Sequence, residues 1–338
     1  MPVPSLQLYS SSSNHPWEAS PLDIRNRLRV LRLSVTDLCN LRCRYCMPAS
    51  GVLKTAHRSL LPLEDLAGLV AWLTTHTGIE SLRLTGGEPL VRPGIQHLIA
   101  KLSTLPRVRE VTLTTNGTLL SRTAWSLKAA GLSRVNVSLD SVDQQRFAEV
   151  TRGGDLSRTL AGIRAAQDAG LIPVKINSVL RRSTWKQEVP RLLDYAATNG
   201  LEIRFIELMR TGTERAWCES EFVSVEDVWR GLGMELVTTK ERGQSPARRT
   251  VVNWRGSGLT VGWITPRSRP FCSQCERLRM DARGQIRRCL MDPITLDLAG
   301  LVKTADLETA IGNFKSYLAA KASPPAMDSS FAMSEIGG

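Results

Sequence analysis

The sequence predicts an α/β fold, in which a partial barrel of six β/α units is followed by a smaller β-rich module. Three observations lead to this prediction. Short β-rich runs alternate with helix-length segments between about residues 28 and 208. Polar residues gather at or just beyond the ends of those runs, where barrel enzymes place their sites. From about residue 245 the pattern changes to that of β-hairpins.

The β-rich runs are the predicted strands of the barrel. They cover residues 28–35, 81–87, 110–117, 134–140, 172–180 and 201–208. Between most of them, apolar residues three and four positions apart predict amphipathic helices at residues 62–76, 93–104, 121–130, 157–169 and 186–198. This alternation is typical of parallel β/α units, which form either a barrel or a doubly wound sheet. The polar strand ends favour the barrel, because there they converge on one mouth, and six units rather than eight leave it open.

After the barrel, the sequence predicts two hairpins, one around the turn at residues 256–258 and one around Arg283 and Gly284. A final helix is predicted at about residues 304–320. We therefore divide the chain into a flexible lead (1–20), the partial barrel (21–244), a C-terminal module (245–320) and a flexible tail (321–338) that ends in two glycines.

Composition and charge limit the class of protein. The 338 residues are 42% hydrophobic, enough for a sizeable core, and the sequence has neither a signal-peptide pattern nor an apolar stretch that could cross a bilayer. We therefore expect a cytoplasmic location and no membrane partner. The net charge of +12 suggests an anionic partner, either nucleic acid or a phosphorylated small molecule, although a generally basic surface explains many of the charges equally well.

The first group of cysteines is Cys39, Cys43 and Cys46, with CX3CX2C spacing, on a loop after the first predicted strand. Three thiolates on one short loop can bind three corners of a [4Fe-4S] cluster and leave the fourth iron open to a small molecule. The alternative is a zinc site completed by one of the four distant histidines.

A second group, Cys272, Cys275 and Cys289, has CX2CX13C spacing. The predicted hairpin through Gly284 brings Cys289 back beside the other two, so that a second three-thiolate site forms. Here the alternative is a small zinc ribbon that lacks one ligand. The seventh cysteine, Cys218, lies outside both groups, and we expect it to have no role as a ligand.

Neighbouring residues favour iron–sulfur chemistry at the first group. Tyr45 precedes the third cysteine and can lie against a ligand ring, Gly86 and Gly87 permit close backbone approach, and Glu88 can accept an ammonium group. This combination resembles the radical S-adenosylmethionine (SAM) superfamily. The resemblance implies that the open iron chelates the amino and carboxyl groups of SAM and that one electron cleaves SAM to methionine and a 5′-deoxyadenosyl radical. It also implies the partial (βα)6 barrel.

From about residue 22 to residue 338 the chain resembles the GTP 3′,8-cyclase family of molybdenum cofactor biosynthesis. The matching segments are LRLSVTDLCNLRCRYCMP, LRLTGGEPLVR, TLTTNGTLL, RVNVSLDS, IRFIELM, FCSQCERLR and the terminal GG. The resemblance implies a lyase that converts GTP to 3′,8-cyclo-7,8-dihydro-GTP: the radical removes hydrogen from C3′ of the ribose, and C3′ then adds to C8 of guanine. It also implies two [4Fe-4S] clusters, the second of which coordinates the purine, a flavodoxin- or ferredoxin-type electron donor, and a homodimer that supplies cyclic pyranopterin monophosphate synthase. No nucleic-acid partner is expected.

The resemblance also assigns residues. Thr114, Ser138 and Met209 are expected to line SAM together with Tyr45 and the Gly86–Glu88 segment. A positive cage in the barrel lumen is expected to contact GTP, and it comprises Arg32, Arg83, Lys175, Arg204, Arg277 and Arg279. Arg277 and Arg279 alternate with Leu278, so in an extended segment they point to the same side. The expected catalytic residues are Arg32, Arg277, Arg279, Gly337 and Gly338. The two glycines are included because a flexible tail that ends in residues without side chains can enter a narrow barrel mouth.

The chain departs from the family pattern at two positions. Leu38 stands where an arginine is usual, and Ser81 stands where a lysine is common, which puts one phosphate contact in doubt. Two other functions remain open on sequence grounds. One is a radical SAM maturase that acts on a peptide, although such proteins tend to carry more C-terminal cysteines. The other is a zinc-containing nucleic-acid-binding protein.

Overall fold

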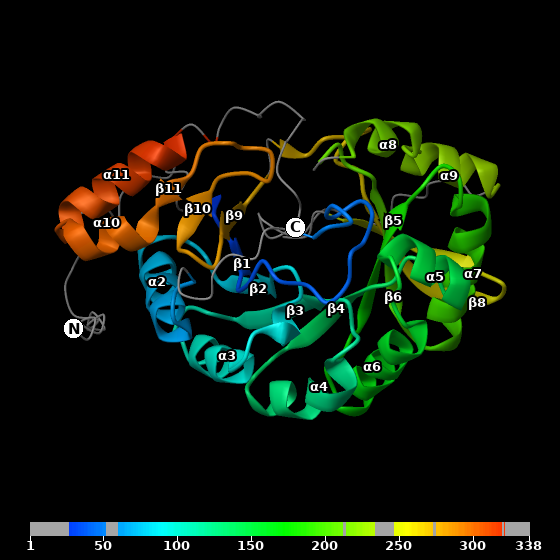
Figure 1. Ribbon diagram of the computed structural model, residues 1–338, viewed down its shortest axis with the longest axis horizontal. Coiled ribbons are helices and arrows are strands. Elements are labelled where there is room, and N and C mark those ends of the chain that lie inside the picture. Colours follow the sequence, from blue (N-terminus) through cyan, green and yellow to red (C-terminus); the bar gives the residue numbers. More distant parts are fainter. Residues whose placement is uncertain are drawn as a thin grey trace.

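A single curved sheet organises the part of the chain that the computed structural model describes, which is residues 27–51, 60–211, 214–233, 247–272, 275–319 and 321. Its strands lie in the order β11-β10-β9-β1-β2-β3-β4-β5-β6-β8-β7. Strands β9, β1 to β6 and β8 are parallel to one another and surround the lumen (Figure 1). The predicted α/β barrel is therefore confirmed, and β7 and β11 are the edges that leave it open.

The six predicted strands are all present. They are β1 (Val30–Ser34), β2 (Ser81–Thr85), β3 (Glu110–Thr115), β4 (Arg134–Ser138), β5 (Lys175–Leu180) and β6 (Glu202–Glu207). Alternation along each strand sorts its side chains between two faces. In β1, for example, Leu31 and Leu33 are fully buried in the hydrophobic core, whereas Arg32 between them lines the lumen. This period of two carries polar groups into the centre of an otherwise apolar barrel.

Helices cover the outer face of the sheet (Figure 1). Those predicted from periodicity are α2 (Leu63–His76), α3 (Ile95–Ser103), α4 (Leu120–Ala129), α6 (Leu156–Asp168) and α7 (Trp185–Thr198). The prediction missed α5 (Gln144–Thr151), α8 (Arg215–Ser220), α9 (Val225–Gly231) and the short 3-10 helix η2 (Pro89–Val91). These four are too short to show a helical period clearly. The start of α5 is nevertheless marked by Asp143, whose side chain accepts a hydrogen bond from the Arg146 amide.

The single final helix predicted at 304–320 is wrong in detail, because two helices lie there. They are α10 (Leu298–Thr304) and α11 (Leu307–Ala319). The side chain of Asp306 accepts a hydrogen bond from the Thr309 amide at 2.9 Å, so a new helix begins where the periodicity suggested continuity.

The β-rich C-terminal strands do not form a sheet of their own. The hairpin of β7 (Arg248–Trp254) and β8 (Ser257–Ile264) adds to β6, while β9 (Arg277–Met280), β10 (Gln285–Arg287) and β11 (Leu296–Asp297) add to β1. Both predicted hairpins are thus present, but they extend the barrel sheet at opposite edges. The domain boundary at residue 245 stays a prediction.

Several predictions concern residues outside the described ranges. The lead at residues 1–20, most of the tail, and Gly337 and Gly338 within it lie outside the described residues. No helix in the described ranges combines the length and the apolar character needed to cross a membrane.

Candidate active site

A cavity of about 530 Å³ runs through the lumen, and all six cysteines of the two groups line it. Cys39 follows the carboxyl end of β1. Cys275 precedes the amino end of β9, which runs parallel to β1 with Arg277 opposite Val30. The first cysteine site (Cys39, Cys43, Cys46) and the second cysteine site (Cys272, Cys275, Cys289) therefore lie toward opposite ends of the strands, with one chamber between them.

The two glycines after β2 hold the chain segment that leads into the first cysteine site. Amides of Gly87 and Glu88 donate to the carbonyls of Thr36 and Leu38, each at 2.7 Å. A Cβ on Gly87 would lie 2.2 Å from the Leu38 carbonyl oxygen, and one on Gly86 would lie 2.5 Å from that of Thr36. Only residues without a side chain permit this approach. The sequence correctly predicted close backbone contact here, and the partner is the protein's own cysteine loop.

Glu88 is buried, and its carboxylate joins its own segment to the end of β3. Oε1 accepts hydrogen bonds from Thr115 Oγ1 at 2.7 Å and from the Leu90 amide at 3.1 Å, while Oε2 accepts from the Asn116 amide at 2.7 Å. Burial raises the pKa of Glu88 to about 7, against the effect of these donors. The carboxylate that the sequence assigned to an ammonium group is thus already committed to backbone and hydroxyl donors, which gives it a positioning role.

Tyr45 is tied to the far wall of the cavity. Its hydroxyl donates to Asp140 Oδ2 at 2.6 Å, and Asp140 Oδ1 accepts from the Val179 amide at 2.8 Å. Burial raises the pKa of Tyr45, of Asp140 and of the Cys43 thiol, and the nearby Cys46 and Asp140 raise the Cys43 pKa further. The Cys43 thiol therefore lies among neutral and acidic groups.

The outer edge of the same loop is clamped to the end of α5. Amides of Arg42 and Arg44 donate to the carbonyls of Thr151 and Val150 at 3.1 and 3.0 Å. The Arg152 guanidinium donates to the carbonyls of Arg42 and Met47 at 3.3 and 2.9 Å. These contacts fix the position of the cysteine loop through its backbone, so the thiols stay available to bind a cluster.

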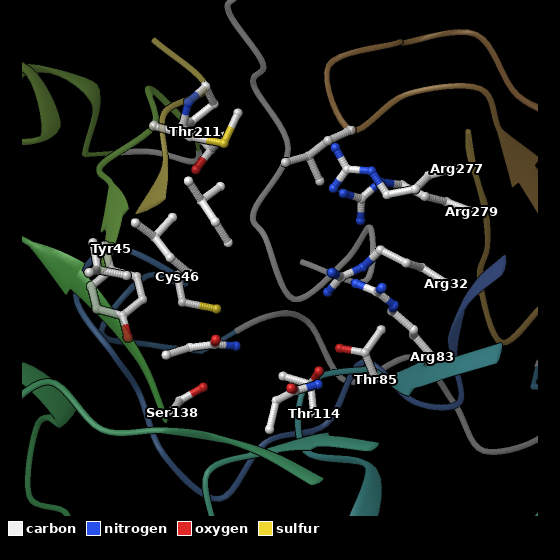
Figure 2. Close-up of a pocket in the computed structure, with 18 of the residues that line it drawn as sticks. Arg32, Tyr45, Cys46, Arg83, Thr85, Thr114, Ser138, Thr211, Arg277 and Arg279 are labelled. Carbon is white, nitrogen blue, oxygen red and sulfur yellow. The ribbon is translucent and has the colours of Figure 1, made fainter. Parts of the chain in front are cut away.

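Buried and half-buried arginines form one wall of the chamber. Arg279, Arg32 and Arg83 lie directly opposite one another on β9, β1 and β2, and Figure 2 shows their guanidinium groups and that of Arg277 gathered across the cavity from Tyr45 and Cys46. Burial lowers the pKa of Arg83, Arg204 and Arg279 to about 10 and that of Arg32 well below its usual value, and neighbouring arginines add to the shift.

These cations are not fully satisfied by the protein. The Nε atoms of Arg32, Arg83 and Arg204 are buried without a hydrogen-bond partner. Like charges opposite one another on adjacent strands repel, and unpaired buried charge is costly. An anion with several oxygens, such as a triphosphate, would relieve both penalties.

Lys175 differs from the other predicted cage residues. It is buried at the start of β5 and forms an ion pair with Glu202 at 2.6 Å, and it is not among the described residues that line the cavity. Burial lowers its pKa to about 8. The structure thus brings Arg32, Arg83, Arg204, Arg277 and Arg279 together and leaves Lys175 behind them.

The second cysteine site lies among cations. Burial alone would raise the pKa of the Cys275 thiol, but the charges of Arg277 and Lys321, with hydrogen bonds from Arg277, lower it to about 7. Leu278 is fully buried in the core while Arg277 and Arg279 line the cavity, as their alternation predicted.

A buried glutamate also anchors the approach to this site. Glu207, at the end of β6, accepts hydrogen bonds from the amides of Val225, Arg267 and Ser268 at 3.2, 3.1 and 2.9 Å and from the Ser268 hydroxyl. It therefore holds the loop that runs on to Cys272, much as Glu88 holds the loop of the first site.

The remaining predicted residues of the site are also placed. Thr114, Ser138 and Met209 line the cavity, and Figure 2 shows Thr114 and Ser138 on one side of it. Cys218 is buried in α8 and is not a lining residue among those described. Sequence reasoning missed Asn136, Asn177, Thr211 and Lys321, which also line the cavity. Strand alternation signals the two asparagines, whereas nothing in the pattern singles out Lys321.

The donor sets fit iron–sulfur clusters. In a [4Fe-4S] cluster each thiolate binds a different iron, so three thiols need not converge on one point. Within the described ranges, no three His, Cys, Asp or Glu side chains are placed to hold a single metal ion. Three thiols at each end of a chamber leave room for a ligand on the cavity side.

Comparisons with known proteins agree with this geometry. Residues 33–196 match the family model described as Radical SAM superfamily, and residues 201–323 match Molybdenum Cofactor Synthesis C. The GTP 3′,8-cyclase of Peptoclostridium acidaminophilum is 43% identical over 282 residues, which cover 83% of this chain and 86% of that protein. That of Moorella thermoacetica is 41% identical over 323 residues, covering 93% and 98%.

Solved structures support the fold alone. Streptococcus suis SuiB bound to the precursor peptide SuiA has a TM-score of 0.61 at 15% identity and covers 92% of this chain and 76% of that one. The protein anSMEcpe with bound AdoMet and the Cp18Cys peptide has a TM-score of 0.55 at 15% identity, with 88% and 84% covered.

Proposed function

The chain belongs to the GTP 3′,8-cyclase family of radical SAM enzymes, and we propose that it converts GTP to 3′,8-cyclo-7,8-dihydro-GTP in the chamber between its two cysteine sites. This is the first committed chemistry of molybdenum cofactor biosynthesis. The observation that carries the proposal is a single cavity with three thiols toward each end and, between them, arginines whose buried Nε atoms lack a hydrogen-bond partner.

At the first site, Cys39, Cys43 and Cys46 would hold a [4Fe-4S] cluster. When bound, this cluster supplies the electron that cleaves SAM and so provides the radical that removes hydrogen from C3′ of GTP. The residues around it serve to position SAM. Tyr45, Thr114, Ser138 and Met209 present side chains to the cavity, and the Gly86–Glu88 segment keeps the cysteine loop in place.

At the second site, Cys272, Cys275 and Cys289 would hold a second [4Fe-4S] cluster with an iron open to the purine of GTP. Arg32, Arg83, Arg204, Arg277 and Arg279 would bind the triphosphate, because planar guanidinium groups donate two hydrogen bonds each to phosphate oxygens. Lys175 would contact GTP after leaving its ion pair with Glu202. A substrate held between the two sites has its ribose near the radical source, and this proximity is worth many orders of magnitude in rate.

Other parts of the proposal follow from the family. Gly337 and Gly338 would reach the chamber, the enzyme would act in the cytoplasm as a homodimer without a nucleic-acid partner, and a flavodoxin- or ferredoxin-type protein would supply electrons. The product would pass to cyclic pyranopterin monophosphate synthase. Family membership argues against the zinc-protein and peptide-maturase alternatives, since the likeness to peptide-binding structures rests on fold only.

An isotope experiment tests the proposed reaction. The anaerobically reconstituted protein is supplied with SAM, dithionite and GTP deuterated at C3′, and the nucleoside products are analysed by mass spectrometry. Deuterium in 5′-deoxyadenosine, together with a cyclised nucleotide, is the expected result. Unlabelled 5′-deoxyadenosine without any change in GTP would contradict the proposal.

A further inference from the structure

We propose that Lys321 is a charge partner of the second cysteine site, delivered there by α11, and that it raises the reduction potential of the cluster that this site holds. The inference rests on the proposed function, because it needs a cluster at the second site. It concerns a residue that the reaction scheme above does not use.

The position of the ammonium group is the first observation. Lys321 Nζ lies 3.7 Å from Cys275 Sγ and 2.5 Å from the carbonyl oxygen of Arg288, and the side chain lines the cavity. One N–H of the Lys321 ammonium group donates to the Arg288 carbonyl, and a second N–H donates to the Cys275 sulfur. An ammonium group in this place touches the ligand atom itself.

The end of α11 is fixed to the sheet, and this attachment determines where Lys321 lies, two residues beyond the helix. The Tyr317 hydroxyl donates to the carbonyls of Ile286 and Ile294 at 3.0 and 2.9 Å. Arg288 donates to the Tyr317 carbonyl at 3.3 Å and lies over the Tyr317 ring, with 4.8 Å from its guanidinium carbon to the ring centroid.

Further contacts lock this arrangement. Arg288 forms an ion pair with Asp292 at 2.6 Å, and Phe314 and Leu318 are fully buried. Cys289 directly follows Arg288, so one short segment carries a cysteine ligand, the carbonyl that accepts from Lys321 and the arginine that holds α11. The helix, the lysine and the second site therefore form one rigid unit.

The charges around Lys321 explain why it can be buried. Burial lowers its pKa, while Cys275 and Cys289 favour the charged form and Arg277 opposes it. A cluster with thiolate ligands is anionic, and each added electron makes it more so. Net charge and hydrogen bonds to the sulfurs are the properties that set the potential of such clusters, and a cation in contact with a sulfur stabilises the reduced state.

The first site provides an internal contrast. The charges that act on the Cys43 thiol are those of Cys46, Asp140 and Cys39, all negative when ionised. A change at Lys321 should therefore affect only the second cluster.

The test is a redox titration of the reconstituted full-length protein, followed by electron paramagnetic resonance. Signals are assigned by ligand: SAM perturbs the first cluster, and GTP perturbs the second. The variants are Lys321→Met, Lys321→Gln and Lys321→Arg, and the matched control is Lys315→Met, which removes an exposed lysine from the same helix.

We expect Lys321→Met and Lys321→Gln to shift the midpoint of the GTP-sensitive signal to more negative potential, with the SAM-sensitive signal unchanged. Lys321→Arg and Lys315→Met should keep both midpoints. An unchanged GTP-sensitive midpoint in Lys321→Gln overturns this inference alone, as does loss of second-site iron in every variant at this position. A wild-type protein without a GTP-sensitive signal overturns the proposed function and this inference with it.

Discussion

At the carboxyl end of the barrel strands, the Cys43 thiol is buried among acidic and neutral groups, and its pKa is raised well above the usual value. At the amino end, Cys275 is also largely buried, yet Arg277 and Lys321 lower the pKa of its thiol to about 7. Both sites contribute three thiols to the same cavity, and a buried glutamate holds the approach to each. The number of ligands therefore does not distinguish them, whereas the surrounding charge does.

This difference matches two different ligands. SAM brings its own positive sulfonium and ammonium groups, which suit the acidic surroundings of the Cys43 thiol. GTP brings a triphosphate, which suits the wall of arginines that continues to the second site. Such charge preferences are stronger in a partly enclosed chamber than in bulk water, because the effective dielectric is lower. Electrostatics can thus orient the two molecules head to tail along the barrel.

The largest expected effect comes from removing a ligand of the first site. Cys43→Ala should abolish SAM cleavage, because the site would keep only two thiols, and 5′-deoxyadenosine should fall below detection by liquid chromatography. The matched variant at the other end, Cys275→Ala, should still cleave SAM while losing the cyclised nucleotide. Equal loss of cleavage in both variants would show that the two sites do not divide the work.

A smaller effect is expected when the arginine wall is shortened. Arg277→Ala with Arg279→Ala should weaken GTP binding by about 100-fold or more, since each charge-assisted hydrogen bond contributes about 1.5–3 kcal/mol. Isothermal titration of the reconstituted enzyme measures this, with Arg283→Ala on the exposed turn of the same hairpin as the control.

Uncoupled SAM cleavage should survive in the double variant, because the first site is untouched. Normal GTP affinity, or loss of iron from the second site, would instead identify the two arginines as structural.

The carboxylate that holds the first site should make stability depend on pH. Burial raises the pKa of Glu88 from 4.5 to about 7, so the folded protein binds this proton more tightly than the unfolded chain. The stabilisation is complete below pH 4.5 and is lost as pH rises through about 7, by up to about 3 kcal/mol.

Glu88→Gln should therefore flatten the fall in melting temperature between pH 5.5 and 8, as measured by differential scanning fluorimetry. A variant whose melting temperature falls with pH as steeply as that of the wild type would show that another group titrates in this range.

The smallest effect is expected at the cysteine that belongs to neither site. Cys218 is buried in α8 and does not line the cavity, so Cys218→Ala should retain the iron content and cyclase activity of the wild type. The stability cost should be about 1 kcal/mol, which chemical denaturation can measure. Loss of iron would show that the thiols have been divided wrongly between the two sites.

Much of this arrangement could be predicted from local sequence pattern. The strand positions of Arg32 and Arg204 predicted that both face the lumen, and the spacing of the cysteines predicted two groups of three, all of which line the cavity. Features that depend on contacts between distant segments could not be read in this way. The hydrogen bonds of Glu88 with Thr115 and Asn116, and the position of Lys321 beside Cys275, require segments brought together by folding.

The same reason explains what the local pattern left open. Hairpin signals after residue 245 do not show which sheet edge a strand will join, and the structure adds β7 and β8 to β6, and β9, β10 and β11 to β1. The resemblance assigns Lys175 to the cage, and that contact stays a prediction. Its ion pair with Glu202 could not be read from the local pattern, because it follows from the register of β5 with β6.

The central claim is that two like sets of thiols serve as separate cluster sites at opposite ends of one chamber. Iron and sulfide analysis of three anaerobically reconstituted proteins tests it most directly: the wild type, a variant with Cys39, Cys43 and Cys46 changed to Ala, and one with Cys272, Cys275 and Cys289 changed to Ala. We predict about eight irons per chain in the first and about four in each of the others, since each site would hold one [4Fe-4S] cluster. About four irons in the wild type, or zinc in place of iron, would contradict the account.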